Sequence, residues 1–101
     1  MTRGEIWLAH VGRKSRPVLV LTRPEVIDVR RLVTVAEITT SIRGIAAEVD
    51  IDHAESGLAR RSAVNCDAHT VAQATPTSRV GAVNDATMRR VCAAVTYALG
   101  C

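Results

Sequence analysis

Aromatic side chains are nearly missing from this sequence. Its 101 residues include one tryptophan, Trp7, one tyrosine, Tyr97, and no phenylalanine. Domains that bind RNA on stacking platforms, such as the RRM and OB folds, need several exposed rings. The scarcity of aromatic residues therefore argues against that mode of binding, and any RNA that the chain binds must be held differently.

Cysteines are few and form no pattern. Cys66, Cys92 and Cys101 are odd in number, and no two of them have the C-x-x-C spacing. Neither a disulfide framework nor a zinc site is indicated. We interpret the cysteines as small hydrophobic residues in a reducing compartment, except that Cys101, as the last residue, is expected to be exposed.

Long hydrophobic runs are also missing. The apolar segments at residues 18–21 and 33–36 are far too short to span a bilayer. The first five residues contain no apolar stretch before a cleavage site, so we expect a cytoplasmic protein with no membrane association. A chain of 101 residues with 48% hydrophobic and 23% charged residues suits one compact domain, and we assign residues 1–101 to it.

Lysine is the next scarce residue. Of the 13 basic residues only Lys14 is a lysine, and the net charge is +3. Arginine binds phosphate through a planar fork of two donors, so this composition favours anionic partners. High genomic GC content also favours arginine over lysine, and the excess charge alone is weak evidence for nucleic acid.

The first two-thirds of the chain reads as short strands separated by turns. We expect strands at residues 4–10, 17–22, 32–37 and 48–51, and weaker strands at 62–67 and 70–74. The β-branched run at 17–22 is typical of a buried central strand, with Pro17 at its first position, where no ladder donor is needed. Residues 12–15, 23–31, 39–44 and 53–57 are predicted to be loops or turns.

The end of the chain predicts one helix. Asn84 is a good N-cap, Asp85 suits the positive end of the helix dipole, and Gly100 lies where a C-terminal glycine belongs. One apolar stripe follows the helical period and is formed by Met88, Val91, Cys92, Val95 and Leu99. Strands followed by a packed helix predict an α+β domain, a strongly curved antiparallel sheet closed by a C-terminal helix.

Two polar clusters adjoin the predicted central strands. A basic stretch at residues 13–16 ends in Arg16, which a rigid proline follows, and three hydroxyl residues at 39–41 follow another strand, with Arg43 close by. Metal-independent RNA cleavage by a 2′-OH needs a fixed cation and donors around the phosphate. Each cluster has a plainer interpretation, because basic loops are usually solvated and hydroxyl residues usually cap turns.

Other catalytic patterns have no support. His10, His53 and His69 have neither a second histidine nor a carboxylate at the spacing of a metal site or triad, so we interpret them as surface or structural residues. No glycine-rich phosphate loop, G-x-S-x-G or H-E-x-x-H motif occurs, which argues against NTPase, α/β-hydrolase and zincin activities. We expect no metal and no cofactor.

Six short motifs, taken in order, resemble those of the MazF/PemK-type toxins. In the first half of the chain they are residues 3–7 (RGEIW), 16–21 (RPVLVL) and 35–41 (VAEITTS). These are similar to the family's R-G-[DE]-[IV]-[YW] opening, its R-P-V-[LV]-V-[IL] strand and its V-A-P-[IL]-T-[TS] segment. In the second half, residues 48–49 resemble its E-V strand and residues 57–67 its G-L…S-V-V-N-x-D segment. Residues 81–100 are similar to the entry and end of its terminal helix.

The resemblance implies a PemK/CcdB-like, SH3-like barrel fold and a homodimer. It implies the toxin component of a type II toxin–antitoxin system, partnered by a MazE-like antitoxin whose acidic tail fills the RNA groove. The implied activity is sequence-specific, metal-independent cleavage of single-stranded RNA, mRNA first and tRNA or rRNA as further candidates. Attack by the 2′-OH would leave a 2′,3′-cyclic phosphate and a 5′-OH.

Carried over by position, Arg16 matches the family's catalytic arginine and Thr39 its catalytic threonine. Arg16 would stabilise the charge of the transition state, and Thr39 would orient the phosphate. We assign RNA binding to the polar side chains of the same and neighbouring segments: Arg13, Lys14, Ser15, Thr40, Ser41, Arg43, Asn65, Asp67, His69 and Thr70.

Three departures from the family pattern concern the same regions. The loop at residues 11–15 is shorter than usual, Glu37 replaces the usual proline, and residues 66–70 are one residue shorter and lack an arginine. We hypothesise that His69 or Asn65 takes over part of the base recognition. Two alternatives stay open: a toxin of the same fold that binds a protein, as CcdB-type gyrase inhibitors do, and a non-catalytic RNA-binding module.

Overall fold

The computed structural model describes residues 3–11, 14–21, 33–66, 70–71 and 76–99. The strands are β1 (Glu5–Val11), β2 (Lys14–Val20), β3 (Val33–Thr39), β4 (Glu48–Ile51), β5 (Ser62–Asn65), β6 (Thr70–Val71) and β7 (Pro76–Ala82). The helices are α2 (His53–Ser56) and α3 (Asp85–Leu99). The loop predicted at residues 23–31 and the helix-ending Gly100 lie outside the described residues, as does Cys101.

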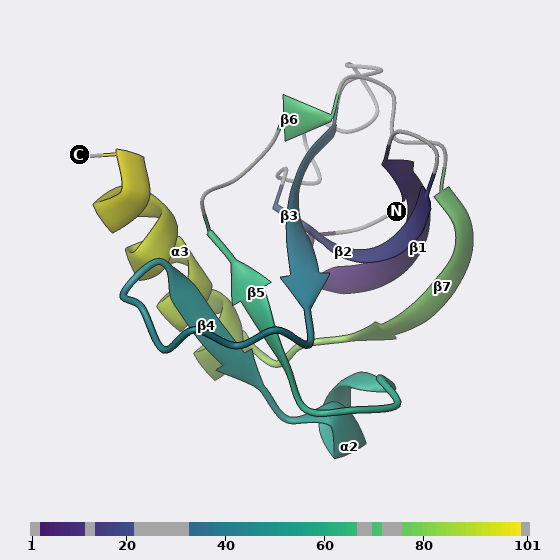
Figure 1. Cartoon of the computed structure of the whole chain (residues 1–101). Coiled ribbons are helices and arrows are strands. Elements are labelled where there is room, and N and C mark those ends of the chain that lie inside the picture. The colour runs from purple at the N-terminus through teal and green to yellow at the C-terminus, as the bar shows by residue number, and fades with distance from the viewer. Residues whose placement is uncertain (1–2, 12–13, 22–32, 67–69, 72–75, 100–101) are drawn as a thin grey trace.

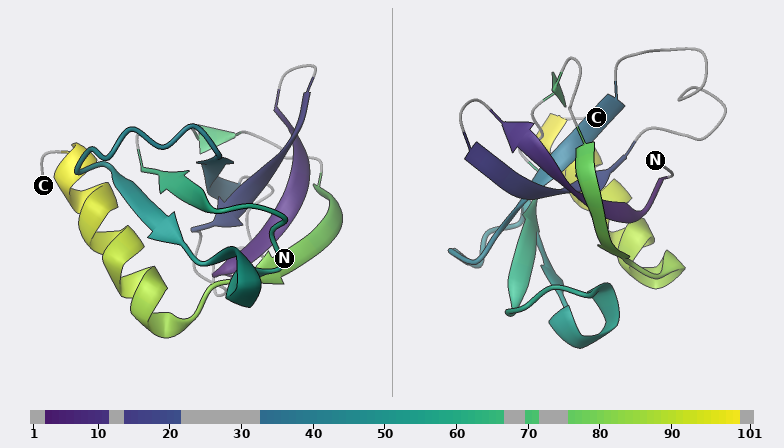
Figure 2. Two further views of the ribbon diagram at one scale, coloured as in Figure 1. Left: turned by 60° about the horizontal axis from the view of Figure 1, so that its bottom comes forward. Right: turned by 90° about the vertical axis from the view of Figure 1, so that its right-hand side faces the viewer.

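All strand pairs are antiparallel, and the sheet has the order β4-β5-β3-β2-β1-β7, with β6 paired to the start of β3. Figures 1 and 2 show that the sheet curls strongly. At one end β1, β2 and β7 form bent arcs, and at the other end β4 and β5 lie beside α3. The predicted α+β fold, a curved antiparallel sheet with a C-terminal helix, is confirmed.

The cluster that packs against α3 lies on one face of the curled sheet. Side chains alternate between the two faces of a strand, so residues paired across strands share a face. Ile6, Leu19 and Ala36 lie opposite one another on β1, β2 and β3, and Val64 of β5 lies opposite Ile38 and Val49. These side chains form one buried cluster with Val91 and Ala94 of α3.

Helix α3 follows the sequence prediction closely. The N–H of Thr87 donates to Oδ1 of Asn84 at 2.8 Å, which confirms Asn84 as the N-cap. Val91 is fully buried, while Met88, Cys92 and Val95 are half-buried along the predicted stripe. Ala94, which was not part of the predicted stripe, is also buried in the core.

The structure corrects the prediction for Pro17. It is not the first residue of its strand, because β2 begins at Lys14, within the segment predicted to be flexible. Pro17 lies opposite Leu8 of β1, but the ladder between β2 and β3 begins only at Val18. A proline is tolerated in the middle of β2 because one side of the strand has no ladder partner at that position.

Other elements differ from the prediction in their bounds. β3 continues to Thr39, which was predicted to belong to a loop, and the predicted turn at residues 53–57 is the short helix α2. β5 ends at Asn65, β6 has two residues, and β7, which begins at Pro76, was not predicted as a strand. Local patterns located the strands, but pairing with neighbours set where each one ends.

Two glycines allow α2 to lie directly against β7. A Cβ at Gly81 would overlap the carbonyl oxygen of Ser56, and a Cβ at Gly57 would lie 2.6 Å from the carbonyl oxygen of Val80. Gly57 also has φ of +83°, a conformation that other residues rarely adopt. The two backbones can therefore make this contact only if both positions lack a side chain.

We expect Gly81→Ala to lower the free energy of unfolding by about 3 kcal/mol, near the upper end for forcing a methyl group into filled space. Gly44→Ala is the control. Gly44 has φ of +69°, and a Cβ at this position would have no neighbour within 4 Å, so the cost is conformational, about 1 kcal/mol. Urea denaturation measures both, and equal losses would contradict the close contact of α2 with β7.

Candidate functional site

The strand register places Arg16 and Thr39 on the same face of the sheet. Val18 of β2 lies opposite Glu37 of β3. Arg16 precedes Val18 by two residues in β2, and Thr39 follows Glu37 by two residues in β3. Because side chains alternate along a strand, all four side chains are on the same face. The ladder between β2 and β3 itself ends at the pair Val18 and Glu37. Alternation of side chains therefore places Arg16 and Thr39 on one face of the sheet, without pairing them directly.

Arg16 places a guanidinium group on this face of the sheet. Its side chain is half-buried, and among the residues that the structure describes it has no hydrogen-bond or ion-pair partner. The other described basic residues include pairs such as Arg61 with Asp50 and Arg79 with Glu5. An unpaired guanidinium on a sheet face can accept an anionic ligand through its planar donors.

Polar residues form a row beside Arg16 and Thr39. Glu37 lies opposite Asn65 of β5, and Asn65 lies opposite Glu48 of β4. This row occupies the same face as Arg16, opposite to the cluster that contains Leu19 and Val91, and each of its three residues is half-buried. Glu37, where the family pattern has proline, thus adds a carboxylate to the face that carries Arg16.

Thr39 is linked to the loop that follows it. Its Oγ1 accepts a hydrogen bond from the N–H of Ser41 at 3.0 Å. The hydroxyl is thereby oriented by the backbone two residues on, a common arrangement for threonine at the end of a strand. The side chain of Thr39 therefore caps the turn that follows β3.

The loop between β3 and β4 is held by a buried carboxylate. Oε1 of Glu48 accepts hydrogen bonds from the N–H groups of Arg43, at 2.8 Å, and Gly44, at 2.9 Å. Oε2 accepts one from Nε of Arg43 at 3.3 Å. The N–H of Glu48 in turn donates to the carbonyl oxygen of Ile45 at 3.0 Å.

The ionisation of Glu48 follows from these contacts. Burial opposes the charged form, but hydrogen bonds from Arg43 and from the backbone N–H of Gly44 outweigh burial, so the pKa of Glu48 is lowered from its ordinary value. The carboxylate is therefore ionised at neutral pH, with its charge directed toward the loop.

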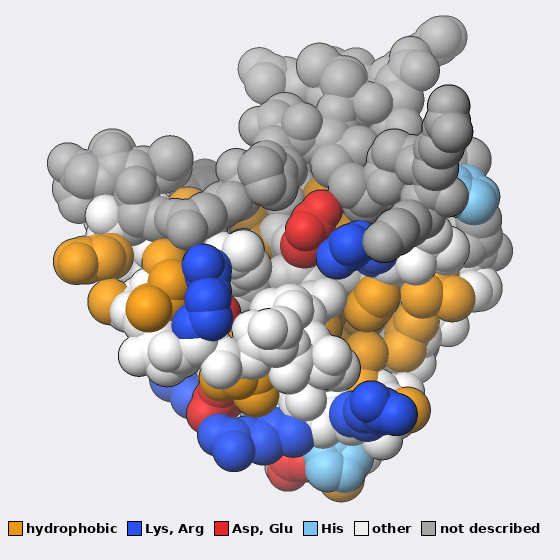
Figure 3. All heavy atoms as spheres, viewed as in Figure 1, with side chains coloured by type: hydrophobic (Ala, Val, Ile, Leu, Met, Phe, Trp, Pro, Cys, Tyr) orange, Lys and Arg blue, Asp and Glu red, His pale blue; other side chains and the backbone are white. Residues whose placement is uncertain are grey.

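The hydroxyl trio at residues 39–41 does not act as one cluster. Thr40 points to a different surface, where it lines an apolar pocket of about 360 Å³ with Leu8, Pro17 and Val80. Ser41 is exposed and contributes its backbone N–H to Thr39. Figure 3 shows apolar side chains gathered above α2, while basic side chains stand apart from one another.

The remaining predicted RNA-binding residues are placed only in part. Ser15 of β2 and Arg43 are exposed, and Lys14 and Thr70 belong to β2 and β6. Arg13, Asp67 and His69 lie outside the described residues. Asn65 lies on the same face as Arg16, in the row with Glu37.

The histidines and cysteines that the structure describes have no shared site. His10 and His53 are exposed, in keeping with surface roles. Cys66 is fully buried in the core, as expected, and Cys92 is half-buried with its Sγ 2.7 Å from Nη2 of Arg3. Within the described ranges no three His, Cys, Asp or Glu side chains gather as a metal ion requires, and no helix is long and apolar enough to cross a membrane.

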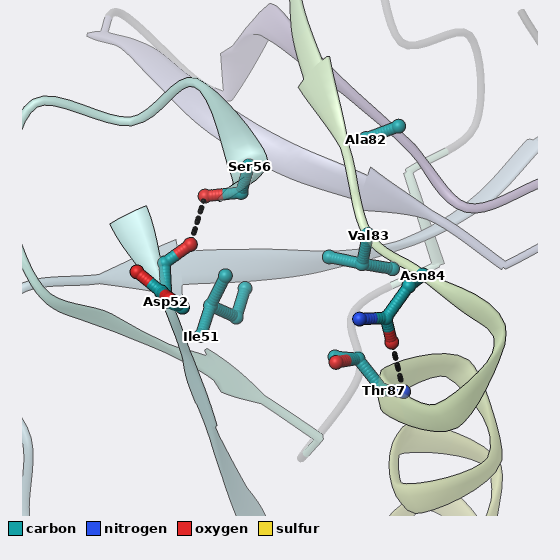
Figure 4. Close-up of a pocket in the computed structure, with 7 residues that line it drawn as sticks. All are labelled: Ile51, Asp52, Ser56, Ala82, Val83, Asn84 and Thr87. Atoms are coloured by element: carbon teal, nitrogen blue, oxygen red, sulfur yellow. Dashed lines mark hydrogen bonds between the residues drawn. The ribbon is translucent and has the colours of Figure 1, made fainter. Parts of the chain in front are cut away.

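A pocket of about 290 Å³ lies between α2 and the start of α3 (Figure 4). Its polar side chains serve the two helices. Oδ1 of Asn84 accepts from Thr87, and the hydroxyl of Ser56 donates to the carbonyl oxygen of Asp52 at 2.9 Å. Because capping explains these groups and no predicted site residue lines the pocket, we interpret it as structural.

Comparison with known proteins identifies the family. Residues 2–99 match the family model described as the PemK-like, MazF-like toxin of type II toxin–antitoxin systems. The chain belongs to this family.

Relatives and solved structures agree. The chain is 42% identical over 103 aligned positions to the probable endoribonuclease MazF5 of Mycobacterium tuberculosis, covering 98% of this chain and 93% of that protein. The structure of the Mycobacterium tuberculosis toxin MazF-mt6 is 36% identical, with a TM-score of 0.86 over 95% of this chain and 96% of that one. An endoribonuclease in complex with its cognate antitoxin from a mycobacterial species, 24% identical, matches in fold with a TM-score of 0.86 over 99% of this chain and 95% of that one.

Sequence reasoning overlooked the role of Glu48. The residue was noted only as part of a motif, although an acidic residue five positions after Arg43, at the first position of a strand, was visible. An acidic side chain that follows a loop containing glycine can accept from the loop's N–H groups. Only the structure shows that this carboxylate is buried and receives three hydrogen bonds.

Proposed function

We propose that this chain is the toxin of a type II toxin–antitoxin system and acts as a sequence-specific, metal-independent endoribonuclease on single-stranded RNA. The observation that carries the proposal is Arg16, which has no partner among the described residues and lies on the same face as Thr39, at positions that match the family motifs. The endoribonuclease names of relatives that match nearly the full length support the same activity.

The proposed chemistry uses the substrate's own 2′-OH as the nucleophile. The 2′-oxygen loses its proton and bonds to phosphorus, the bond from phosphorus to the 5′-oxygen breaks, and the 5′-oxygen takes up a proton. Arg16 stabilises the extra charge on phosphorus, and the hydroxyl of Thr39 helps to hold the phosphate in line. Protonation of the leaving oxygen by Arg16 is the less favourable of its roles, since a guanidinium rarely releases its proton.

Substrate binding is assigned to the residues around this pair. Ser15, Ser41 and Arg43 are exposed near the ends of β2 and β3 and provide hydroxyl and guanidinium donors for phosphates. Asn65, on the same face as Arg16, is proposed to contact a base. Arg13, Lys14, Thr40, Asp67, His69 and Thr70 remain proposed RNA-binding residues.

The biological setting is proposed from the family. We propose that residues 1–101 form one toxin domain that works in the cytoplasm as a homodimer. The family description names a type II toxin–antitoxin system, so the expected protein partner is a MazE-like antitoxin. The basic composition, with pI near 9.1, suits both an RNA substrate and a partner with an acidic segment.

Replacing the proposed catalytic cation tests the function directly. Arg16→Ala is expected to lower the rate of RNA cleavage by at least about 10²-fold, the scale of losing one preorganised donor to a transition state. Arg89→Ala, which removes an exposed arginine from α3, is the matched control and should retain the wild-type rate. Digestion of a mixed-sequence transcript, followed by gel analysis, measures both, and a folded Arg16→Ala protein of normal activity would exclude the proposed role.

The identity of the nucleophile is tested on the substrate. Once the cut site is mapped, replacing the ribose 5′ to it with deoxyribose should abolish cleavage in the presence or absence of EDTA. Binding should change little, because the phosphate contacts remain. Mass spectrometry of normal products should show a cyclic phosphate and a 5′-OH, whereas a 5′-phosphate would identify water as the nucleophile.

Glu37 provides a test of the electrostatics of this face. Its carboxylate lies on the same face as Arg16, so it should repel the RNA backbone. Glu37→Gln is expected to strengthen binding of the deoxy-substituted RNA by roughly two- to fivefold, as for other partly exposed charge pairs, with less effect at high salt. Fluorescence anisotropy at two salt concentrations measures this; unchanged binding would place Glu37 away from the RNA path, and weaker binding would contradict the expected repulsion.

A further inference from the structure

The loop between β3 and β4 has few constraints of its own. Residues 40–47 form no strand ladder, and Gly44, with φ of +69°, has open space around it. At the distal end of the loop, the carbonyl oxygen of Ala47 accepts from the N–H of Cys66 at 2.6 Å. In the middle of the loop, at Arg43 and Gly44, the backbone is held by hydrogen bonds to the side chain of Glu48.

The ion pair between Glu48 and Arg43 is strongly asymmetric. The Glu48 side chain is 2% exposed, while the Arg43 side chain is 55% exposed. The carboxylate is thus buried under the loop, and the guanidinium extends from it into solvent. A pair that only stabilised the fold would gain little from an exposed partner, since such surface pairs contribute about 0–1 kcal/mol.

Arg43 keeps most of its donors for another molecule. A guanidinium carries five N–H donors, and Arg43 uses the one on Nε to bind Glu48. Among the described residues its two Nη groups have no partner. The Nη groups form one edge of the planar guanidinium, which matches two oxygens of a phosphate.

We propose that Glu48 is a positioning residue for the RNA, which holds the loop and the Arg43 side chain so that the Nη groups of Arg43 bind a backbone phosphate. This inference rests on the proposed function and names a second phosphate contact besides Arg16. The lowered pKa of Glu48 agrees with it, because the carboxylate stays charged while it orients the arginine.

Removal of the negative charge of Glu48 should change RNA binding in the direction opposite to the usual one. Removing a negative charge from a protein that binds RNA ordinarily strengthens binding. Glu48→Gln should instead weaken it, because the amide oxygen can replace Oε1 for the two loop N–H groups, but the amide nitrogen that replaces Oε2 is a donor facing Nε of Arg43. Binding of the deoxy-substituted RNA should fall by about tenfold, the scale of losing one charge-assisted contact.

Glu37→Gln is the matched control. Glu37 and Glu48 lie on either side of Asn65 in the same row, and the same substitution at each removes one negative charge. Glu37 accepts no N–H from the loop, so its substitution should strengthen binding while that of Glu48 weakens it. Opposite signs support the positioning role, and strengthening by both variants would overturn it.

A double-mutant cycle with Arg43→Ala shows whether Glu48 acts through the arginine. Arg43→Ala should weaken binding to a similar extent, lower the salt dependence by about one ion, and leave kcat within a few-fold while KM rises. Glu48→Gln added to Arg43→Ala should then change binding less than twofold. Independent effects of the two substitutions would contradict the proposal.

These variants distinguish an error in the proposed function from an error in the positioning role of Glu48. Circular dichroism first establishes that each variant is folded, and the exposed Arg43→Ala variant provides a test that leaves the buried carboxylate in place. If the wild-type chain does not cleave RNA, or Arg16→Ala cleaves it at the wild-type rate, the proposed function is wrong. If both behave as expected while Arg43→Ala and Glu48→Gln bind normally, only the positioning role of Glu48 is wrong.

Discussion

The pairing of β2 with β3 is the constraint on which both the core and the candidate site depend. Val18 lies opposite Glu37, and this single register places Leu19 and Ala36 toward α3 while it places Arg16 and Thr39 on the other face. A slip of one residue would turn Leu19 to the site and Arg16 to the core. The free energy of burying the core therefore also fixes which side chains meet the ligand, without any interaction between Arg16 and Thr39 themselves.

Helix α3 and the centres of most strands could be predicted from short stretches of sequence. α3 was predicted from its apolar period and from Asn84, because a cap and a helical stripe both act within a few turns. The strand centres were predicted for a similar reason. The strand ends were not, since Pro17 is tolerated inside β2 only because the ladder with β3 stops at Val18.

The candidate site was predictable in its members but not in its arrangement. The motifs gave Arg16 and Thr39, and the register places them on one face. The hydroxyl trio was treated as one cluster, yet alternation of side chains sends Thr40 to an apolar pocket. Glu48 was missed because its effect depends on burial and on the path of a loop, which no residue pattern encodes.

The position of α3 in the sequence has a consequence for the biosynthesis of the protein. The helix follows the seven strands that the structure describes, and its Val91 and Ala94 cover the apolar face that the strands have assembled. During synthesis on the ribosome, that face therefore has no cover from α3 until residues 85–99 have been added. The last element to be made is thus the one that closes this cluster, over strands already paired across long sequence distances.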